Sequence, residues 1–100
     1  MSYLQQTTNS EHNLIPVGQL RSYPVTSAVS ALSVGEQATH VMIQAQGGTV
    51  RWRVDGGNNV TVAWSLPDGA YMTLHATTAR KLRFARNDED CVLVVQDLHV

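Results

Sequence analysis

The side chains of this chain that could do chemistry are spread along it and do not cluster. Its four histidines, His12, His40, His75 and His99, include no pair at the i, i+2 or i, i+4 spacing that often seeds a metal site. Three of them could still converge across strands. The single cysteine, Cys91, begins an apolar run and has no cationic neighbour to activate its thiol. We therefore interpret the histidines as surface or interface residues and Cys91 as a buried structural thiol.

Other patterns also fail to match a catalytic or cofactor-binding site. Asp88, Glu89 and Asp90 are consecutive, whereas a calcium loop needs carboxylates at alternate positions and a glycine between them. The glycine-rich stretch 55–59 precedes a predicted strand, so it cannot form the phosphate-binding N-terminus of a helix. No Ser/His/Asp spacing matches a hydrolase signature. We predict no metal, no cofactor and no catalytic residue, and we do not expect an enzyme.

Two arginines on either side of a tryptophan are the most informative polar residues. Arg51 and Arg53 fall on one face of a predicted strand, where they could pair with Asp55 or with a carboxylate across the sheet. One interpretation is a solvated face behind a core anchored by Trp52. The other is an intersubunit contact made by Arg51, Arg53 and Asp55, because arginine is enriched in interfaces and binds carboxylates with two hydrogen bonds.

The strand that carries these arginines belongs to the stretch 38–57, around which the chain is organised. Val41, Ile43 and Ala45 alternate with polar neighbours, and Val50, Trp52 and Val54 do the same after Gly47-Gly48. Alternation with a period of two places one row of side chains against a core. Two such runs joined by glycines predict a β-hairpin.

The segments before this hairpin are less regular. Prolines restrict Leu14–Tyr23 to a short edge strand or an extended crossing. In Val25–Val34, the spacing of Val25, Val29 and Leu32 fits a helix. The same segment also fits a strand, with small residues on both of its alternating rows. We predict a strand there, because Thr26 and the serines disfavour a helix and everything that follows reads as β.

Further strands and turns follow the hairpin. Val60, Val62 and Trp64 form one alternating row, and a turn follows at 66–69. The strand at 70–76 turns Met72 and Leu74 to one side, and the strand at 81–85 turns Leu82 and Phe84 inward. Cys91–Val95 is apolar on both rows, which predicts a central strand covered on each side. The pattern assigns Trp52 and Trp64 to the core; the alternative is a stacking platform for carbohydrate made by Trp52, Trp64 or Tyr71.

One hundred residues are enough for a single domain. Residues 1–13 have only Tyr3 and Leu4 as sizeable apolar groups, so we predict a flexible N-terminal arm, which could order along a neighbouring subunit through these two anchors. Residues 14–100 are predicted to form an all-β domain, a small β-sandwich or jelly-roll-like barrel of about seven to eight antiparallel strands.

Composition argues against several classes of partner. The formal net charge of −1 provides no field to attract a polyanion, so we expect no nucleic-acid partner. No apolar run approaches the ~20 residues that cross a bilayer, and residues 1–13 lack the apolar region of a signal peptide. A lone cysteine allows no internal disulfide and fits synthesis in a reducing compartment such as the cytoplasm.

From Ala38 to the end, the chain resembles a family of small structural proteins of tailed bacteriophages. The resemblance rests on a "His-x-x-Ile-Gln" strand followed by "Val-Arg-x-Arg-x-Asp-Gly", which His40, Ile43, Gln44, Val50, Arg51, Arg53, Asp55 and Gly56 match, on the strand at Gly69–Leu74 and on the terminal apolar strand CVLVVQDL. The segment around Trp64 departs from the glycine-rich pattern of the family.

The resemblance implies a non-enzymatic virion component with a β-sandwich fold. It predicts a capsid decoration (cement) protein that binds the major capsid protein or other virion proteins as a dimer or trimer. A head–tail or tail/fibre adaptor is the alternative within the virion, and a carbohydrate-binding module is the alternative outside that class.

Overall fold

The computed structural model describes residues 14–55 and 63–100 of the chain. The predicted arm at 1–13, with Tyr3 and Leu4, and the row begun by Val60 and Val62 lie outside these residues. The described strands are β1 (Ile15–Val25), β2 (His40–Gln46), β3 (Val50–Arg53), β4 (Trp64–Leu66), β5 (Tyr71–His75), β6 (Arg83–Arg86) and β7 (Cys91–His99), and one helical turn, α1 (Ala76–Ala79), follows β5.

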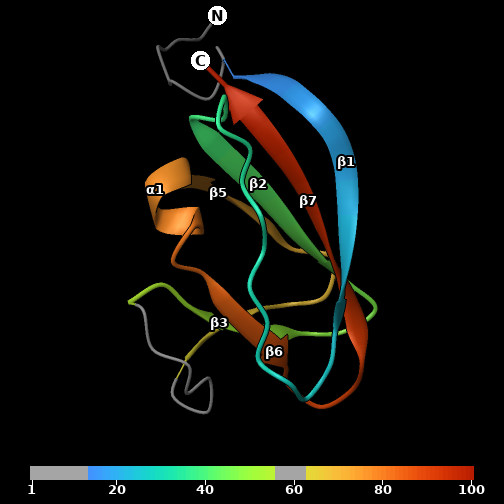
Figure 1. The fold of residues 1–100 in the computed structure, drawn as a ribbon. Helices are drawn as coiled ribbons and strands as arrows, with labels where there is room; N and C mark the ends of the chain where they lie inside the picture. The colour runs from blue at the N-terminus through green and yellow to red at the C-terminus, as the bar shows by residue number, and fades with distance from the viewer. Residues whose placement is uncertain (1–13, 56–62) are drawn as a thin grey trace, which may run out of the picture.

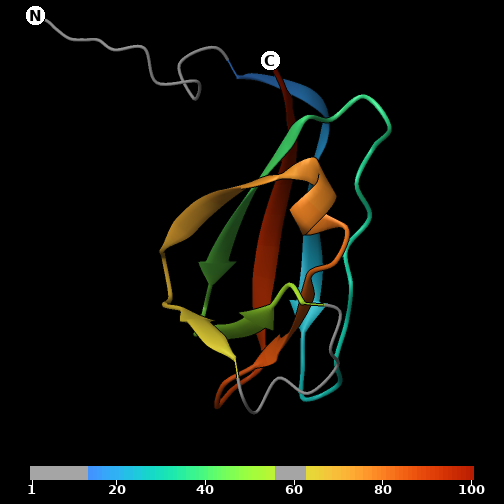
Figure 2. The ribbon, with the colours of Figure 1, turned by 90° about the vertical axis from the view of Figure 1, so that its left-hand side faces the viewer.

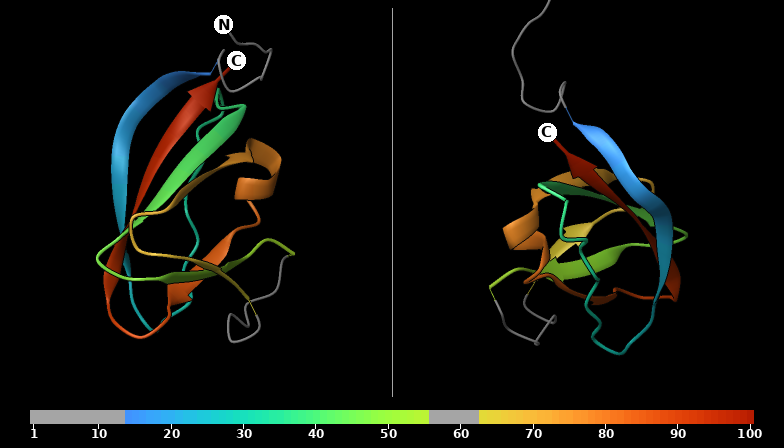
Figure 3. Two further views of the ribbon diagram at one scale, coloured as in Figure 1. Left: turned by 180° about the vertical axis from the view of Figure 1, so that it is seen from behind. Right: turned by 45° about the horizontal axis from the view of Figure 1, so that its top comes forward.

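The strands form two antiparallel sheets. One has four strands in the order β1-β7-β2-β5, and the other has three in the order β4-β3-β6. β3 runs across the direction of β2 and β7, so that the sheets enclose the core between them (Figure 1). The view from behind in Figure 3 shows β1, β7 and β2 side by side above this crossing. The predicted all-β sandwich is confirmed, with seven strands in the described part of the chain.

The core takes one row of side chains from each sheet. Its largest fully buried side chains include Ile43 on β2, Leu93 and Val95 on β7, and Leu82 and Phe84 at β6. Ile43, Leu82 and Phe84 come from rows that the alternation assigned to the inside, whereas both rows of β7 were expected to be covered. Met72 and Leu74 of β5 also pack against this cluster, as predicted. Period-two alternation therefore identified the buried face of most strands.

The predicted hairpin at 38–57 is wrong, because its two strands belong to different sheets. β2 is flanked by β5 and β7, whereas β3 is flanked by β4 and β6. Between them, Gly47 has φ +88°, a conformation that favours glycine, and a Cβ at Gly48 would lie 3.2 Å from Cβ of Cys91. The two glycines carry the chain closely over the start of β7 from one sheet to the other.

The predicted strand at Val25–Val34 is also wrong. Val25 ends β1, and beyond it only Ser30 pairs, in an isolated bridge in which Ser30 and Phe84 exchange two backbone hydrogen bonds of 2.9 and 3.0 Å. The amide of Ala28 donates to Oγ1 of Thr26 at 3.2 Å, a local turn that competes with a ladder. Small side chains on both rows provide little area to bury, and Leu32 is the buried residue that holds the segment.

Two predictions about strand position have mixed outcomes. Of the two alternatives for the first segment, a short edge strand or an extended crossing, the structure shows an edge strand. β1 is not short, however: it has 11 residues and continues through Pro24 to Val25, which an edge position permits. β7 is central, as expected, but only one of its faces is covered: Leu93 and Val95 are buried, while Val92 is 37% exposed. The second apolar row of β7 therefore faces outward.

In the part of the chain that the structure describes, no helix is long and apolar enough to cross a membrane.

Candidate interaction surfaces

The outer face of the four-stranded sheet, hereafter the uncharged face, is the broadest regular surface of the described residues. Strand register turns a row from each of the four strands onto it: Pro16, Ser22 and Pro24 of β1; Val92, Val94, Gln96 and Leu98 of β7; His40, Met42, Gln44 and Gln46 of β2; and Tyr71, Thr73 and His75 of β5. With neutral histidines, none of these side chains carries a charge.

The uncharged face combines apolar and amide groups. Val92 and Tyr71 are exposed, whereas Met42 and Val94 are half-buried between their neighbours. The rings of His40 and His75 meet edge to face with their centroids 5.1 Å apart. Covering such a surface desolvates no ion, and the desolvation of ions is what makes charged surfaces costly to bury. The face is therefore suited to contact with another protein surface.

The only charged residues within these four strands point the other way. Nη2 of Arg21 donates to Oδ1 of Asp97 at 3.0 Å, and the amide of Gly35 donates to Oδ2 of Asp97 at 3.0 Å. Asp97 is 5% exposed. A Cβ at Gly35 would lie 2.9 Å from Oδ2, so a larger residue there would displace the carboxylate. The pair joins β1 and β7 to the long connection that crosses from β1 to β2.

The arginine of this pair is held in its charged form. Burial alone would lower the pKa of Arg21, but the hydrogen bonds and attraction of Asp97, helped by the hydroxyl of Tyr23, outweigh it, and the pKa is raised above the ordinary arginine value. The opposite holds at Tyr23, where burial alone would raise the pKa, but bonds from the Ser33 amide and from Arg21 lower it.

The outer face of the three-stranded sheet, hereafter the arginine face, differs in chemistry. Arg51 and Arg53 of β3 are half-buried there, and Arg83 of β6 lies opposite Arg53. Arg53 donates from Nε to Oδ1 of Asp55 at 2.8 Å and from Nη2 to Oδ2 at 2.5 Å. These bonds raise the pKa of Arg53. The predicted pairing with Asp55 is confirmed, and a role for these residues in an interface stays a prediction.

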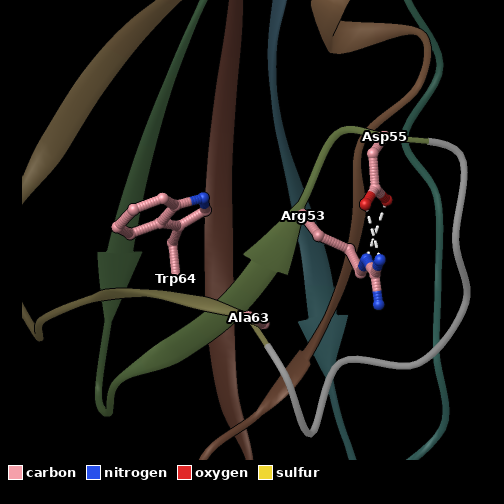
Figure 4. A pocket seen from close by; sticks show the side chains of 4 residues that line it. All are labelled: Arg53, Asp55, Ala63 and Trp64. Carbon is pink, nitrogen blue, oxygen red and sulfur yellow. Dashed lines mark hydrogen bonds and ion pairs between the residues drawn. The ribbon is translucent and has the colours of Figure 1, made fainter.

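A hollow lies beside this ion pair (Figure 4). It measures about 380 Å³ and is lined by Arg53, Asp55, Ala63 and Trp64. The ring of Trp64 and the joined side chains of Arg53 and Asp55 stand on either side of Ala63. The arrangement places an aromatic ring near hydrogen-bonding groups.

Assignment of Trp64 to the core is wrong, since its side chain is 69% exposed. β4 is a three-residue strand at the edge of its sheet, a position that leaves Trp64 open to solvent. Trp52, directly opposite in the ladder, packs against the core as predicted, with its ring centroid 6.4 Å from that of Trp64. Tyr71, the third aromatic candidate, is exposed on β5, on the other sheet.

The remaining candidates are structural in their surroundings. Cys91 is buried, and burial, together with the nearby carboxylates of Asp68, Glu89 and Asp90, raises the pKa of its thiol. Residues 14–55 and 63–100 contain no group of three or more histidine, cysteine, aspartate or glutamate side chains able to hold a metal ion. The structure does bring His40 and His75 together, which their separation in sequence did not indicate.

Sequence patterns alone missed the uncharged face as a unit. The row His40, Met42 and Gln44 and the row Tyr71, Thr73 and His75 were both visible as alternating positions. What was missing was their pairing, which the structure supplies: Gln44 lies opposite Tyr71 and Val94, and His40 lies opposite His75.

Comparison with known proteins identifies no relative: no protein-family model matches the chain, and neither a curated protein nor a solved structure does.

Proposed function

We propose that this chain is a structural protein of a tailed bacteriophage virion: a decoration protein that binds the outer shell and stabilises the joints between capsomers. The proposal starts from the resemblance of the stretch that runs from His40 to Gly56, and the sandwich fold agrees with it. The observation that carries a contact function is the uncharged face, which presents a broad sheet surface without a single formal charge.

The size of this face suits a repeated contact. Three strand spacings of about 4.8 Å and a nine-residue strand at about 3.3 Å per residue give a plan of roughly 14 by 30 Å. That is about half of the ~800 Å² that each partner buries in a stable interface, before the relief of the side chains is counted. A modest contact of this kind stabilises a shell when many copies make it, because opening the shell must break all of them.

The test is binding to shells of the phage that encodes the chain. Shells formed by the major capsid protein of that phage are sedimented with the purified chain and imaged by electron microscopy. A decoration protein occupies every equivalent lattice position. A few copies confined to the neck or tail would instead identify the adaptor, and an absence of binding to any virion component would refute the virion role.

Two lysine variants, one on the outer face of each sheet, test which face makes the contact with the shell. Val94→Lys puts a lysine near the centre of the uncharged face, and Ser65→Lys puts the same charge on the exposed outer side of β4 as a matched control. We expect Val94→Lys to weaken shell binding about tenfold or more, because the contact must then desolvate an ion, while Ser65→Lys binds like the parent chain. Equal effects of the two variants would contradict the assignment of the contact to the uncharged face.

One observation favours a second function, carbohydrate binding. Sugar sites commonly stack a ring on an exposed aromatic side chain and add polar groups at its rim, and Trp64 beside Arg53 and Asp55 offers both. Titration with glycans while tryptophan fluorescence is followed tests it. A shift that Trp64→Ala abolishes supports the module; unchanged fluorescence across a glycan panel rejects it. Trp52 provides the internal reference.

A further inference from the structure

The four sheet edges in the described residues differ in how they are protected against pairing with another chain. β1 contains two prolines, Gly18 at φ +73° and an irregular register between Val17 and Arg21. β4 is only three residues long. β6 is covered by the connection after β1, where Ser30 bridges to Phe84 and the carbonyl of Thr26 accepts from the amide of Arg86 at 2.9 Å. Prolines, bulges, short strands and covering segments are the usual protections of a sheet edge.

Among residues 14–55 and 63–100, none of these protections is found at β5. Its residues, Tyr71–His75, include no charge, proline or glycine, and its pairing with β2 runs without a shift in register. No described strand lies beyond it in the sheet. In Figure 2, β5 forms the left-hand margin of the molecule. An uncharged edge without these protections is a template for a further strand.

The hydrogen bonds to β2 show which backbone groups of β5 face this edge. The amide of Ala45 donates to the carbonyl of Ala70 at 3.1 Å, and the amide of Ala76 donates to the carbonyl of Thr39 at 2.9 Å. In an antiparallel ladder, alternate residues bond to the same neighbour. Met72 and Leu74 therefore bond toward β2, and the N–H and C=O groups of Tyr71, Thr73 and His75 point to the open edge.

We propose that β5 pairs antiparallel with β5 of a second copy of this chain, about a two-fold axis at Thr73. Tyr71 of each copy then lies opposite His75 of the other, and the two Thr73 residues face one another. All of these residues direct their backbone groups outward, so each opposed pair exchanges two hydrogen bonds. The two four-stranded sheets become one continuous sheet, and the two uncharged faces join into a single surface.

A second copy is the occupant that fits the charges around this edge. Asp68 is exposed before β5, and its carboxylate also accepts from the amide of Gly47 at 2.9 Å. Arg80 and Lys81 are exposed after the helical turn that follows β5, and Arg80 also donates to the carbonyl of Gly35 at 3.3 Å. An antiparallel copy brings the acidic end of one edge toward the basic end of the other. Between these ends, threonine opposite threonine and tyrosine opposite histidine are favourable cross-strand pairs, and no like charges meet. This inference stands on β5 and does not rest on the virion role.

The test combines solution mass with residue-resolved amide exchange in the intact chain. We expect sedimentation equilibrium to show a dimer that forms as the concentration rises. The amides of Tyr71, Thr73 and His75 should become protected in step with the dimer, while those of Met72 and Leu74 are protected in monomer and dimer alike. A chain that stays monomeric at every concentration, or a dimer that leaves these three amides exchanging freely, would overturn the proposal.

Substitutions then test whether the two-fold axis of the dimer lies at Thr73. Thr73→Lys sets two like charges against one another and is expected to weaken the dimer about tenfold or more. Ser22→Lys puts the same charge on β1, the opposite edge strand of the same sheet, and is expected to leave the dimer intact. Thr73→Val keeps a β-branched residue and retains the dimer. A dimer that tolerates Thr73→Lys is held by another surface, and the exchange measurement on the parent chain decides the matter if that variant does not fold.

Discussion

The two outer sheet faces of this sandwich are built from strands of similar apolar content but carry opposite chemistry. The face of β1, β7, β2 and β5 presents no charge, and the two charges in those strands, Arg21 and Asp97, are joined beneath it. The face of β3 and β6 presents Arg51, Arg53 and Arg83. In these strands, the position of a charged residue in the alternation of side chains therefore decides which face of its sheet it lies on. The sorting leaves one face that can be covered without desolvating ions and one that keeps its ions in contact with solvent or with Asp55.

The largest effect is expected at the ion pair beneath the uncharged face. Asp97→Ala removes the carboxylate that accepts from Arg21 and from the Gly35 amide, and leaves the Arg21 guanidinium with the carbonyl of Ser33 at 2.7 Å. We expect the free energy of unfolding to fall by about 2–4 kcal/mol. Urea unfolding measures it. As a control on the other sheet, Arg86→Ala breaks an exposed i, i+4 pair with Asp90 and should cost no more than about 0.5 kcal/mol. Similar costs for both variants would show that the inward pair is not what distinguishes the two sheets.

A smaller effect is expected on the arginine face. We predict that Arg51→Ala combined with Arg53→Ala weakens assembly more than it weakens monomer folding, because ion pairs near the surface contribute little to folding, whereas arginines bind carboxylates in interfaces. The loss of shell binding should be less than that of Val94→Lys, since Arg53 is already engaged by Asp55 within the chain. Sedimentation with shells and urea unfolding provide the two readouts. Unchanged assembly would restrict the contact to the uncharged face.

The smallest effect concerns Cys91, over which Gly47 and Gly48 lead the chain from one sheet to the other. Burial and the neighbouring carboxylates raise the pKa of this thiol in the folded chain above its unfolded value. The neutral thiol therefore contributes its full stability below the unfolded pKa of about 8.5, and that contribution is lost as the pH rises through the folded pKa. We expect alkylation by iodoacetamide at neutral pH to be much slower in the folded chain than in urea. Equal rates in both states would place the thiol at the surface.

Much of the fold was predictable from local pattern. Alternation identified the inward rows of β2, β5 and β6, and the turn around 66–69 separates two strands as expected. The errors share one cause. The hairpin, the strand at Val25–Val34 and the core position of Trp64 each depend on which distant segment lies alongside, and adjacent sequence does not contain that information. The pairing of Arg53 with Asp55 was predictable because those residues are two positions apart on the chain.

The sequence by itself determined that this chain forms short pleated strands, which side of most strands is buried, and that Arg51 and Arg53 share a face. These follow from the geometry of the extended backbone, which sends successive side chains to opposite sides. Only the tertiary structure decided that β2 and β3 lie in separate sheets, that Arg21 meets Asp97 across the chain, and that uncharged rows from four strands merge into one surface beside an open edge. Strand order arises from the joint burial of all strands in one core, so no single stretch of sequence specifies it.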